Sequence, residues 1–331
     1  MSIFRFGILG AAKIAVKFCQ AVSLIAGCEV CAVASKSKER AEHFAAENGG
    51  VRAYGSYEEL LDTEKPDCAY IAVTPNDHCR LAMLCIQRGI PVLCEKAMFQ
   101  NSREAEQVFA AAAARSVFVM EAMWSRFLPA VKKVRAWVEE GRIGIPEISR
   151  ISIGFIAPEG DENRYRNPRL GGGAAKDITV YAYEITTWIL NQDIRNISVS
   201  AAWGESGVDM NNHISIEFAH TLADLATSFA ANLESQMVLY GGKGKIVLPA
   251  PHHSTECFLY DERGEVTEHF TDRETANGFT YEIEEAISCV REGRQESTVV
   301  PWKDTLACAK LFDRIEATKI AGGSMERQFP G

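Results

Sequence analysis

The stretch Phe-Arg-Phe-Gly-Ile-Leu-Gly-Ala-Ala-Lys-Ile-Ala, residues 4–15, decides the fold of this chain. Its apolar run, residues 6–9, is typical of a buried strand, and a helical pattern follows Gly10. A strand that turns on glycine into a helix indicates a dinucleotide-binding unit, because free N–H groups at the helix start can hold a pyrophosphate. The usual pattern is G-x-G-x-x-G/A. Here Ala12 replaces the second glycine, which is tolerable if its φ stays negative. The alternative is an ordinary buried strand–helix turn.

Composition limits the class of protein. The chain has 331 residues, enough for two domains, and its 47% hydrophobic and 24% charged residues are typical of a globular protein. The formal net charge of −9 argues against binding to nucleic acid or to an anionic membrane surface. We therefore expect no nucleic-acid and no membrane partner.

The ten cysteines are typical of small buried hydrophobic residues in a reducing compartment. Met1 and Ser2 lead directly into the first strand, so we expect no signal peptide. The long apolar stretch 108–124 is interrupted by charged residues and is a poor membrane span. These features predict a cytoplasmic protein. The pair His252-His253 has no third ligand at zinc spacing, so we interpret it as a loop and expect no metal site.

The residues after the second strand, 29–34, should face the ribose of a dinucleotide. An enzyme that uses NAD usually has Asp or Glu there, to accept from the 2′-hydroxyl. This chain instead offers Ser35, Lys36 and, a turn later, Arg40, which suit a 2′-phosphate. We predict NADP(H) in preference to NAD(H); the alternative is a solvated basic loop.

Strands and helices alternate through the first third of the chain, which predicts a parallel, doubly wound sheet. The segment Thr74-Pro75-Asn76-Asp77-His78 follows the strand 68–73, and Glu95-Lys96 follows the strand 91–94. Both lie at carboxyl ends of parallel strands, where ligands of such sheets bind. Lys96 is therefore a candidate acid/base or binding residue; the alternative is a surface lysine on a loop.

The pattern of apolar residues and turn signals changes at residue 148. Short β-like segments separated by turns predict a mostly antiparallel open sheet. We therefore predict α/β, with a doubly wound dinucleotide-binding (Rossmann) domain at residues 1–121 and an α+β domain at 122–331. The expected strands are 148–155, 197–203, 213–218, 222–232, 236–240, 245–248, 256–260 and 266–270. Two late amphipathic helices, 279–292 and 304–320, are predicted to serve packing.

One helix interrupts this β region, starting after Gly171-Gly172-Gly173 and running to Leu190. Asp177 and Tyr181 are four residues apart, so they share a face near its N-terminus. A carboxylate and a phenol there suggest one group that orients and one that moves a proton. The alternative is an aspartate favoured by the helix dipole beside a half-buried tyrosine.

Taken together, several motifs resemble the glucose–fructose oxidoreductase/inositol dehydrogenase/MocA (Gfo/Idh/MocA) family, over nearly the whole chain. They are Gly-Ile-Leu-Gly-Ala-Ala-Lys-Ile-Ala (7–15), Thr-Pro-Asn (74–76), Cys-Glu-Lys (94–96), Met-Glu-Ala-Met-Trp-Ser-Arg-Phe (120–127) and Gly-Gly-Gly-Ala-Ala-Lys-Asp (171–177). The first and fourth, with Tyr-Glu-Ile-Glu-Glu (281–285), look most like the branch of dihydrodiol dehydrogenases and NADP-dependent xylose dehydrogenases.

The resemblance implies roles for individual residues. Lys96 and Tyr181 would be catalytic, Tyr181 as the acid/base and Lys96 binding the reacting oxygen, with Asp177 orienting the substrate. Trp124 and Phe155 would line the substrate pocket together with these three. The predicted cofactor-binding residues are Gly10, Ala11, Ala12, Lys13, Ile14, Ser35, Lys36, Arg40, Thr74, Pro75, Asn76, His78, Glu95, Lys96, Trp124 and Arg126. The chain departs from the family at Ala97, where proline is usual, at His78, which stands one position early, and at Lys176.

The sequence therefore predicts an NADP(H)-dependent oxidoreductase that transfers a hydride between the nicotinamide and a secondary alcohol or carbonyl of a sugar, polyol or diol. For a small-molecule enzyme of this kind, the resemblance also implies a homo-oligomer, with the second domain serving substrate binding and forming a dimer through the second sheet. One alternative is a non-catalytic NADP(H)-binding redox sensor or regulatory protein. The other is a glycosidase or epimerase that retains its nicotinamide.

Overall fold

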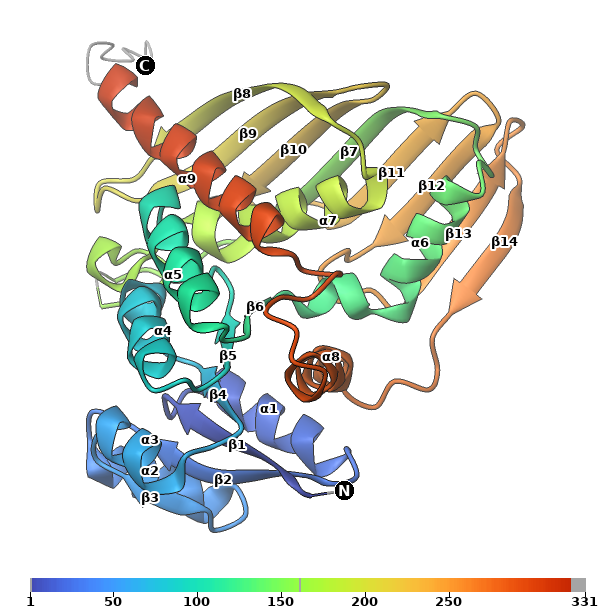
Figure 1. Cartoon of the computed structure of the whole chain (residues 1–331). Helices are drawn as coiled ribbons and strands as arrows, with labels where there is room; N and C mark the ends of the chain where they lie inside the picture. The colour runs from blue at the N-terminus through green and yellow to red at the C-terminus, as the bar shows by residue number, and fades with distance from the viewer. Residues whose placement is uncertain (1, 161, 323–331) are drawn as a thin grey trace. The chain divides into compact units, whose positions relative to one another are not determined.

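The computed structural model of the chain describes residues 2–160 and 162–322 (Figure 1). The chain forms two compact units, and neither is continuous in sequence. Unit 1 comprises Met1–Phe127 and Glu274–Ala307, and unit 2 comprises Leu128–Arg273 and Cys308–Gly331. The domain boundary after residue 121 stays a prediction. No helix within the described residues is long and apolar enough to cross a membrane.

Unit 1 is built on a six-stranded parallel sheet in the order β3-β2-β1-β4-β5-β6. The strands are β1 (Phe4–Leu9), β2 (Cys28–Ala34), β3 (Arg52–Tyr54), β4 (Cys68–Ile71), β5 (Val92–Glu95) and β6 (Val119–Ala122). The direction of strand order reverses between β1 and β4, and such switch points are where open α/β sheets bind ligands. The predicted doubly wound sheet is confirmed.

Helices connect these strands and cover the sheet (Figure 1). They are α1 (Lys13–Ser23), α2 (Lys38–Glu47), α3 (Tyr57–Glu64), α4 (His78–Gln87), α5 (Ser102–Arg115) and, from late in the chain, α8 (Phe279–Arg291). Helix α8 packs against α1, where the side-chain amide of Asn277 donates to the Lys17 carbonyl at 2.9 Å. The late helix therefore belongs to the dinucleotide-binding fold.

The core of unit 1 sits between the sheet and these helices. Strands β4, β5 and β6 are buried at every position, and apart from Glu95 in β5 and Glu121 in β6 their residues are apolar or aromatic. Tyr70 of β4 stacks on Phe18 of α1 with ring centroids 3.7 Å apart, and Phe6 of β1 meets Phe18 edge-on. These rings hold α1, and so its N-terminus, against the sheet.

Unit 2 contains an eight-stranded sheet in the order β14-β13-β12-β11-β7-β10-β9-β8. Its strands are β7 (Pro146–Gly154), β8 (Ile194–Trp203), β9 (Asp209–Phe218), β10 (Leu222–Ser228), β11 (Gln236–Gly241), β12 (Gly244–Pro249), β13 (Glu256–Asp261) and β14 (Val266–Thr271). All neighbours pair antiparallel except β7 and β10, which are parallel. The predicted, mostly antiparallel sheet is confirmed.

Helices of unit 2 cover one face of this sheet (Figure 1): α6 (Pro129–Glu139), α7 (Val180–Leu190) and the part of α9 (Trp302–Gly322) that follows Ala307. Burial alternates along β9, as expected when one face is packed and the other is open. The strand expected to continue to Asn232 ends at Ser228. There the Ser228 hydroxyl accepts from the N–H groups of Ala230 and Ala231, both at 2.9 Å, which turns the chain.

Candidate active site

The glycine turn after β1 has the geometry that a dinucleotide entry requires. Gly10 is buried with φ +121°, and a Cβ at this position would collide with the carbonyl oxygen of Ala72. Ala12 is the N-cap of α1 with φ −103°, so the methyl group that replaces the usual glycine is accommodated without left-handed strain. The condition under which alanine is tolerable here, a negative φ, is therefore met.

The N-terminus of α1 suits an anion. No side chain of the described residues caps it, and its first turn carries no acidic residue. The N–H groups near Ala11, Ala12, Lys13 and Ile14 therefore combine with the helix dipole to attract negative charge. Ala11, Ala12 and Ile14 are half-buried, and Lys13 is exposed. These residues fit the pyrophosphate of a dinucleotide.

The predicted ribose-reading residues lie just after β2. Ser35 is buried, and its hydroxyl accepts from the Ser37 N–H at 3.4 Å. Lys36 is 69% exposed, and its Nζ lies 2.6 Å from Asp77 Oδ2. Arg40 is exposed in the first turn of α2. The predicted cations are thus present, but one of them is already paired with a carboxylate.

Asp77 also forms an ion pair with Arg80, a residue that the sequence analysis did not identify. The guanidinium of Arg80 on α4 donates to Asp77 Oδ1 at 2.9 Å. Burial alone would raise the pKa of Asp77, but the hydrogen bonds from Arg80 and Lys36 hold it below its ordinary value. Asp77 therefore stays ionised at neutral pH and offsets part of the positive charge of Lys36 and Arg80. The i,i+3 spacing of Asp77 and Arg80 was the available signal.

The Thr-Pro-Asn segment follows β4 as a 3₁₀ turn, Pro75–Asp77. The Thr74 hydroxyl donates to Asn76 Oδ1 at 2.6 Å, and Asn76 itself is exposed. His78, by contrast, is fully buried. Its Nδ1 lies 3.0 Å from the Ala97 carbonyl oxygen, and its Nε2 lies 3.0 Å from that of Val73. The imidazole therefore faces backbone on both sides.

Lys96 follows β5 in a segment that three buried side chains hold. The Tyr70 hydroxyl donates to Glu95 Oε1, on the residue before it, and His78 contacts the carbonyl of Ala97, on the residue after it. The Met98 N–H donates to Glu121 Oε1 at 2.9 Å, and Glu121 Oε2 accepts from the Thr305 hydroxyl at 2.9 Å. The Lys96–Ala97 peptide bond is cis. This segment is therefore positioned by side chains from β4, α4, β6 and α9.

Three carboxyl groups are buried around this segment. Burial raises the pKa of Glu95, against the lowering effect of the Tyr70 hydrogen bond and the Lys96 ammonium. Burial also raises the pKa of Glu121. Glu282 of α8 has no exposed surface, and neither of its carboxyl oxygens has a hydrogen-bond partner among the described residues. Burial and the nearby Glu95 carboxyl raise the pKa of Glu282 well above its ordinary value, which favours the neutral acid.

Trp124 and Arg126 belong to a 3₁₀ turn, Trp124–Phe127, after β6. The Trp124 indole is half-buried and meets the ring of Phe279 edge-on, with centroids 5.1 Å apart. Arg126 is fully buried, and its Nη1 donates to Asp304 Oδ2 at 2.7 Å and to the Val299 carbonyl at 2.9 Å. Arg126 thus fixes the start of α9 within unit 1.

In unit 2, the helix after the three glycines begins with a π turn, Ala175–Thr179, before α7. The sequence pattern predicted an uninterrupted helix here. The buried Asp209 accepts from the Ala175 N–H and from Asn212 Nδ2, both at 2.6 Å. A Cβ on Gly173 would collide with the Asp209 carboxylate, so the glycine is required where the chain enters this turn. Asp209 therefore sets the geometry of a segment that carries predicted site residues.

The predicted substrate residues of unit 2 lie on or near this segment. Asp177 is part of the π turn, and its Oδ1 lies 3.3 Å from Arg164 Nη1. Tyr181 is in the first turn of α7 and is 9% exposed. Phe155 forms an aromatic cluster with Tyr165 and Phe229, with ring centroids 5.1–5.4 Å apart.

A histidine that we interpreted as part of a loop lies beside Tyr181. The rings of His252 and Tyr181 have centroids 5.5 Å apart. His253 meets His252 edge-on at a centroid distance of 4.2 Å. The adjacency of the two histidines is the only feature of the sequence that marks this position, and residue spacing does not show that His252 lies beside Tyr181.

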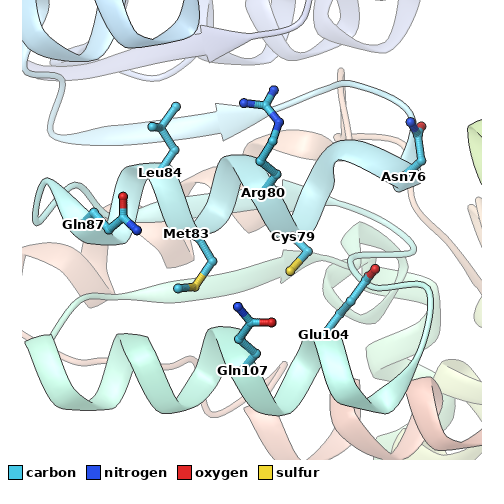
Figure 2. Close-up of a pocket in the computed structure, with 8 residues that line it drawn as sticks. All are labelled: Asn76, Cys79, Arg80, Met83, Leu84, Gln87, Glu104 and Gln107. Carbon is cyan, nitrogen blue, oxygen red and sulfur yellow. The ribbon is translucent and has the colours of Figure 1, made fainter.

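A groove of about 490 Å³ opens between α4 and α5 of unit 1. Figure 2 shows Cys79 and Met83 of α4 pointing toward Gln107 of α5, with Arg80 directed away from them. Asn76 at its rim is the one predicted site residue among those that line it. The groove lies outside the Lys96 segment, so we assign it no part in the chemistry.

The glycine turn, the uncapped α1 and the fixed lysine segment define an oxidoreductase fold for a dinucleotide, and comparison with known proteins agrees. Residues 4–123 match the family described as "Oxidoreductase family, NAD-binding Rossmann fold", and residues 131–247 match the "GFO/IDH/MocA C-terminal domain". The chain belongs to the Gfo/Idh/MocA family of oxidoreductases.

Curated relatives match nearly the whole chain. The chain is 32% identical over 330 residues to trans-1,2-dihydrobenzene-1,2-diol dehydrogenase of Mus musculus, covering 96% of this chain and 97% of the relative. It is 30% identical over 323 residues to the enzyme of the same name from Xenopus tropicalis, covering 93% and 96%.

Solved structures share the fold. A 3-ketoreductase from Actinomadura kijaniata, in complex with NADP and TDP-benzene, superposes with a TM-score of 0.85 at 22% identity, over 95% of this chain and 97% of that one. An aldose–aldose oxidoreductase from Caulobacter crescentus, in complex with glycerol, has a TM-score of 0.85 at 18% identity, over 96% and 98%.

Proposed function

We propose that this protein is an NADP(H)-dependent dehydrogenase or reductase for a secondary alcohol or carbonyl of a sugar, polyol or diol, with Lys96 and Tyr181 as its catalytic residues. The observation that carries the proposal is the Lys96 segment, which Tyr70, His78 and Glu121 hold at the carboxyl end of β5. Such fixation suits a residue that must meet a reacting oxygen. The curated relatives named dihydrodiol dehydrogenase support the substrate class.

Each proposed residue has a chemical role. In the oxidative direction, Tyr181 takes the proton of the substrate hydroxyl, the Lys96 ammonium binds the same oxygen, and Asp177 orients the substrate. When bound, the nicotinamide supplies the hydride acceptor. Trp124 and Phe155 provide apolar walls for the carbon skeleton.

We also propose a preference for NADP(H) over NAD(H). Ser35, Lys36, Arg40 and Arg80 supply a hydroxyl and cations near the end of β2, and the chain lacks the carboxylate that usually accepts from the ribose there. Ser35→Asp should place a carboxylate against the 2′-phosphate and shift the ratio of affinities toward NADH. An unchanged ratio would place the ribose elsewhere.

For the oligomeric state, we propose a homodimer through the open face of the sheet in unit 2. An apolar row crosses three strands of that face: Leu222 pairs in register with Ile148, which pairs with Tyr240. Leu222 is 55% exposed and Tyr240 is 39% exposed. Light scattering of the wild type and of Leu222→Glu tests this, since a charge in the row should produce monomers.

We propose a cytoplasmic location because all ten cysteines are free thiols, as is usual in a reducing compartment. Cys28 and Cys31 form a Cys-x-x-Cys pair on β2, but burial raises the pKa of each thiol to about 11, which disfavours the reactive thiolate.

The first experiment is a titration of the purified protein with NADPH and, separately, NADH, followed by nicotinamide fluorescence. Tight NADPH binding with weak NADH binding supports the cofactor assignment and leads to a panel of polyols, sugars, diols and their carbonyl forms. Binding of neither cofactor would contradict the proposal. Tight NADPH binding without turnover of any panel member would favour a redox sensor, and product formation without net change in NADPH would favour an epimerase or glycosidase.

A further inference from the structure

We infer that His252 and His253 form a proton relay that connects Tyr181 with solvent. The inference rests on the proposed role of Tyr181 as the acid/base, and it adds two residues to that site. Every described group in this relay belongs to unit 2.

Burial increases stepwise from solvent to the phenol. Tyr181 is 9% exposed, His252 is half-buried, and His253 is exposed. A buried acid/base must exchange one proton with water in every catalytic cycle, so it needs a path out of the protein. The two imidazoles follow Tyr181 in order of increasing exposure, and the exposed His253 meets solvent.

The ring contacts show that the three side chains are direct neighbours. The centroids of Tyr181 and His252 are 5.5 Å apart with a 41° angle between ring planes. The centroids of His252 and His253 are 4.2 Å apart and nearly perpendicular, at 74°. Polar atoms of adjoining rings at these separations can be joined by a hydrogen bond or by one bridging water.

The turn between β12 and β13 holds the histidines in place. The His253 N–H donates to the Ala250 carbonyl at 2.9 Å, and the Ala250 N–H donates to the Ser235 carbonyl at 2.8 Å. The buried Ser254 hydroxyl donates to the Glu256 carbonyl at 2.7 Å. A turn that is bonded on both sides of His252 keeps the imidazole beside Tyr181.

Imidazole suits this task because it accepts a proton at one nitrogen and releases one from the other near neutral pH. In the oxidative direction, the substrate O–H bond breaks, and the electron pair of the adjoining C–H bond leaves as hydride to the nicotinamide. As Tyr181 takes the substrate proton, it gives its own to His252. His252 passes a proton to His253, and His253 releases one to water. One proton thus appears in solution for each hydride transferred, and all three side chains return to their starting state.

The test compares proton release with NADPH formation in a single turnover, using a pH indicator in weak buffer. In the wild type, both signals should rise together. In His252→Asn, proton release should lag behind NADPH formation, and steady-state turnover should fall by about tenfold or more. Added free imidazole should restore turnover, because it replaces the missing carrier. His253→Asn, at an exposed position, should give the same pattern more weakly. His220→Asn, an exposed histidine of the same unit, is the matched control and should behave as wild type.

Rescue by imidazole separates a relay from a structural role, since a misfolded site would not respond. A second readout needs no turnover: in histidine NMR titrations, Tyr181→Phe should shift the midpoint of His252 and leave that of His220 unchanged. Synchronous signals and unchanged turnover in both His252→Asn and His253→Asn would overturn the relay while the proposed function stands. A wild type that oxidises no panel substrate, or a fully active Tyr181→Phe, would instead overturn the proposed function and the relay with it.

Discussion

The Nδ1 atom of His78 lies 3.0 Å from the carbonyl oxygen of Ala97, which ties the segment after β4 to the residue that follows Lys96. The other ring nitrogen lies 3.0 Å from the Val73 carbonyl, so one imidazole connects the carboxyl ends of two neighbouring strands. Burial lowers the pKa of His78, which favours the neutral ring and therefore one N–H donor for two acceptors. His78 acts on Lys96 through the backbone, as a positioning residue.

We predict that His78→Phe reduces kcat by about tenfold to a hundredfold, because a small displacement of Lys96 is enough to disturb the reaction geometry. The dissociation constant for NADPH should change little. The free energy of unfolding should fall by about 1–3 kcal/mol, since a buried hydrogen bond to backbone is lost. Kinetics, nicotinamide fluorescence and urea unfolding measure the three quantities. His43→Phe, at an exposed site on α2, is the control. Equal loss of kcat and of NADPH affinity would instead assign His78 to cofactor binding.

If the proposed mechanism holds, Lys96→Met and Tyr181→Phe should each lower turnover by about a hundredfold or more, because each removes a group proposed to handle the reacting oxygen or its proton. NADPH binding should be largely kept in both. Single-turnover absorbance measures the chemical step, and fluorescence titration measures the binding. A variant with near-normal turnover would remove that residue from the mechanism.

Asp77→Asn should strengthen NADPH binding by about threefold to tenfold, because Lys36 and Arg80 would lose a competing carboxylate and become available to the 2′-phosphate. NADH affinity should stay within about twofold. The effect should shrink as salt is added, since all three groups are partly exposed. Asp62→Asn, which breaks a comparable pair with Arg88, is the matched control. Weaker NADPH binding in Asp77→Asn would show that Asp77 orients these cations instead of competing for them.

Glu282→Gln should change how stability depends on pH. The pKa of Glu282 is raised in the folded protein, so its contribution to stability is fully present below its ordinary value of 4.5 and is lost as pH rises toward the folded pKa. Glutamine stays neutral, so the variant should gain stability relative to wild type as pH rises, by at most about 1.4 kcal/mol per pH unit.

Urea unfolding at about pH 5 and about pH 8 measures this difference. Glu284→Gln, at an exposed position on the same helix, provides the control and should leave the wild-type pH dependence unchanged. A constant difference between Glu282→Gln and wild type at both pH values would mean that Glu282 is ionised and partnered in solution.

The sequence by itself determined the local elements of this protein. The run from β1 through Gly10 into α1 is encoded by neighbouring residues, because apolar spacing, a glycine turn and helix propensity act over a few positions. The same holds for the N-cap of α3, where the Ser56 hydroxyl accepts from the Glu59 N–H within a single turn. Motif order and strand alternation were enough for the fold class.

Only the tertiary structure decided which of these elements lie side by side. His78 meets Ala97, Glu282 approaches Glu95, and Tyr181 meets His252, each pair from segments that no local pattern connects. The interpretation of His252-His253 as a loop describes the backbone correctly, but it does not say what the two rings contact. Burial, charge pairing and proton pathways depend on long-range packing, so residue spacing along the chain does not contain them.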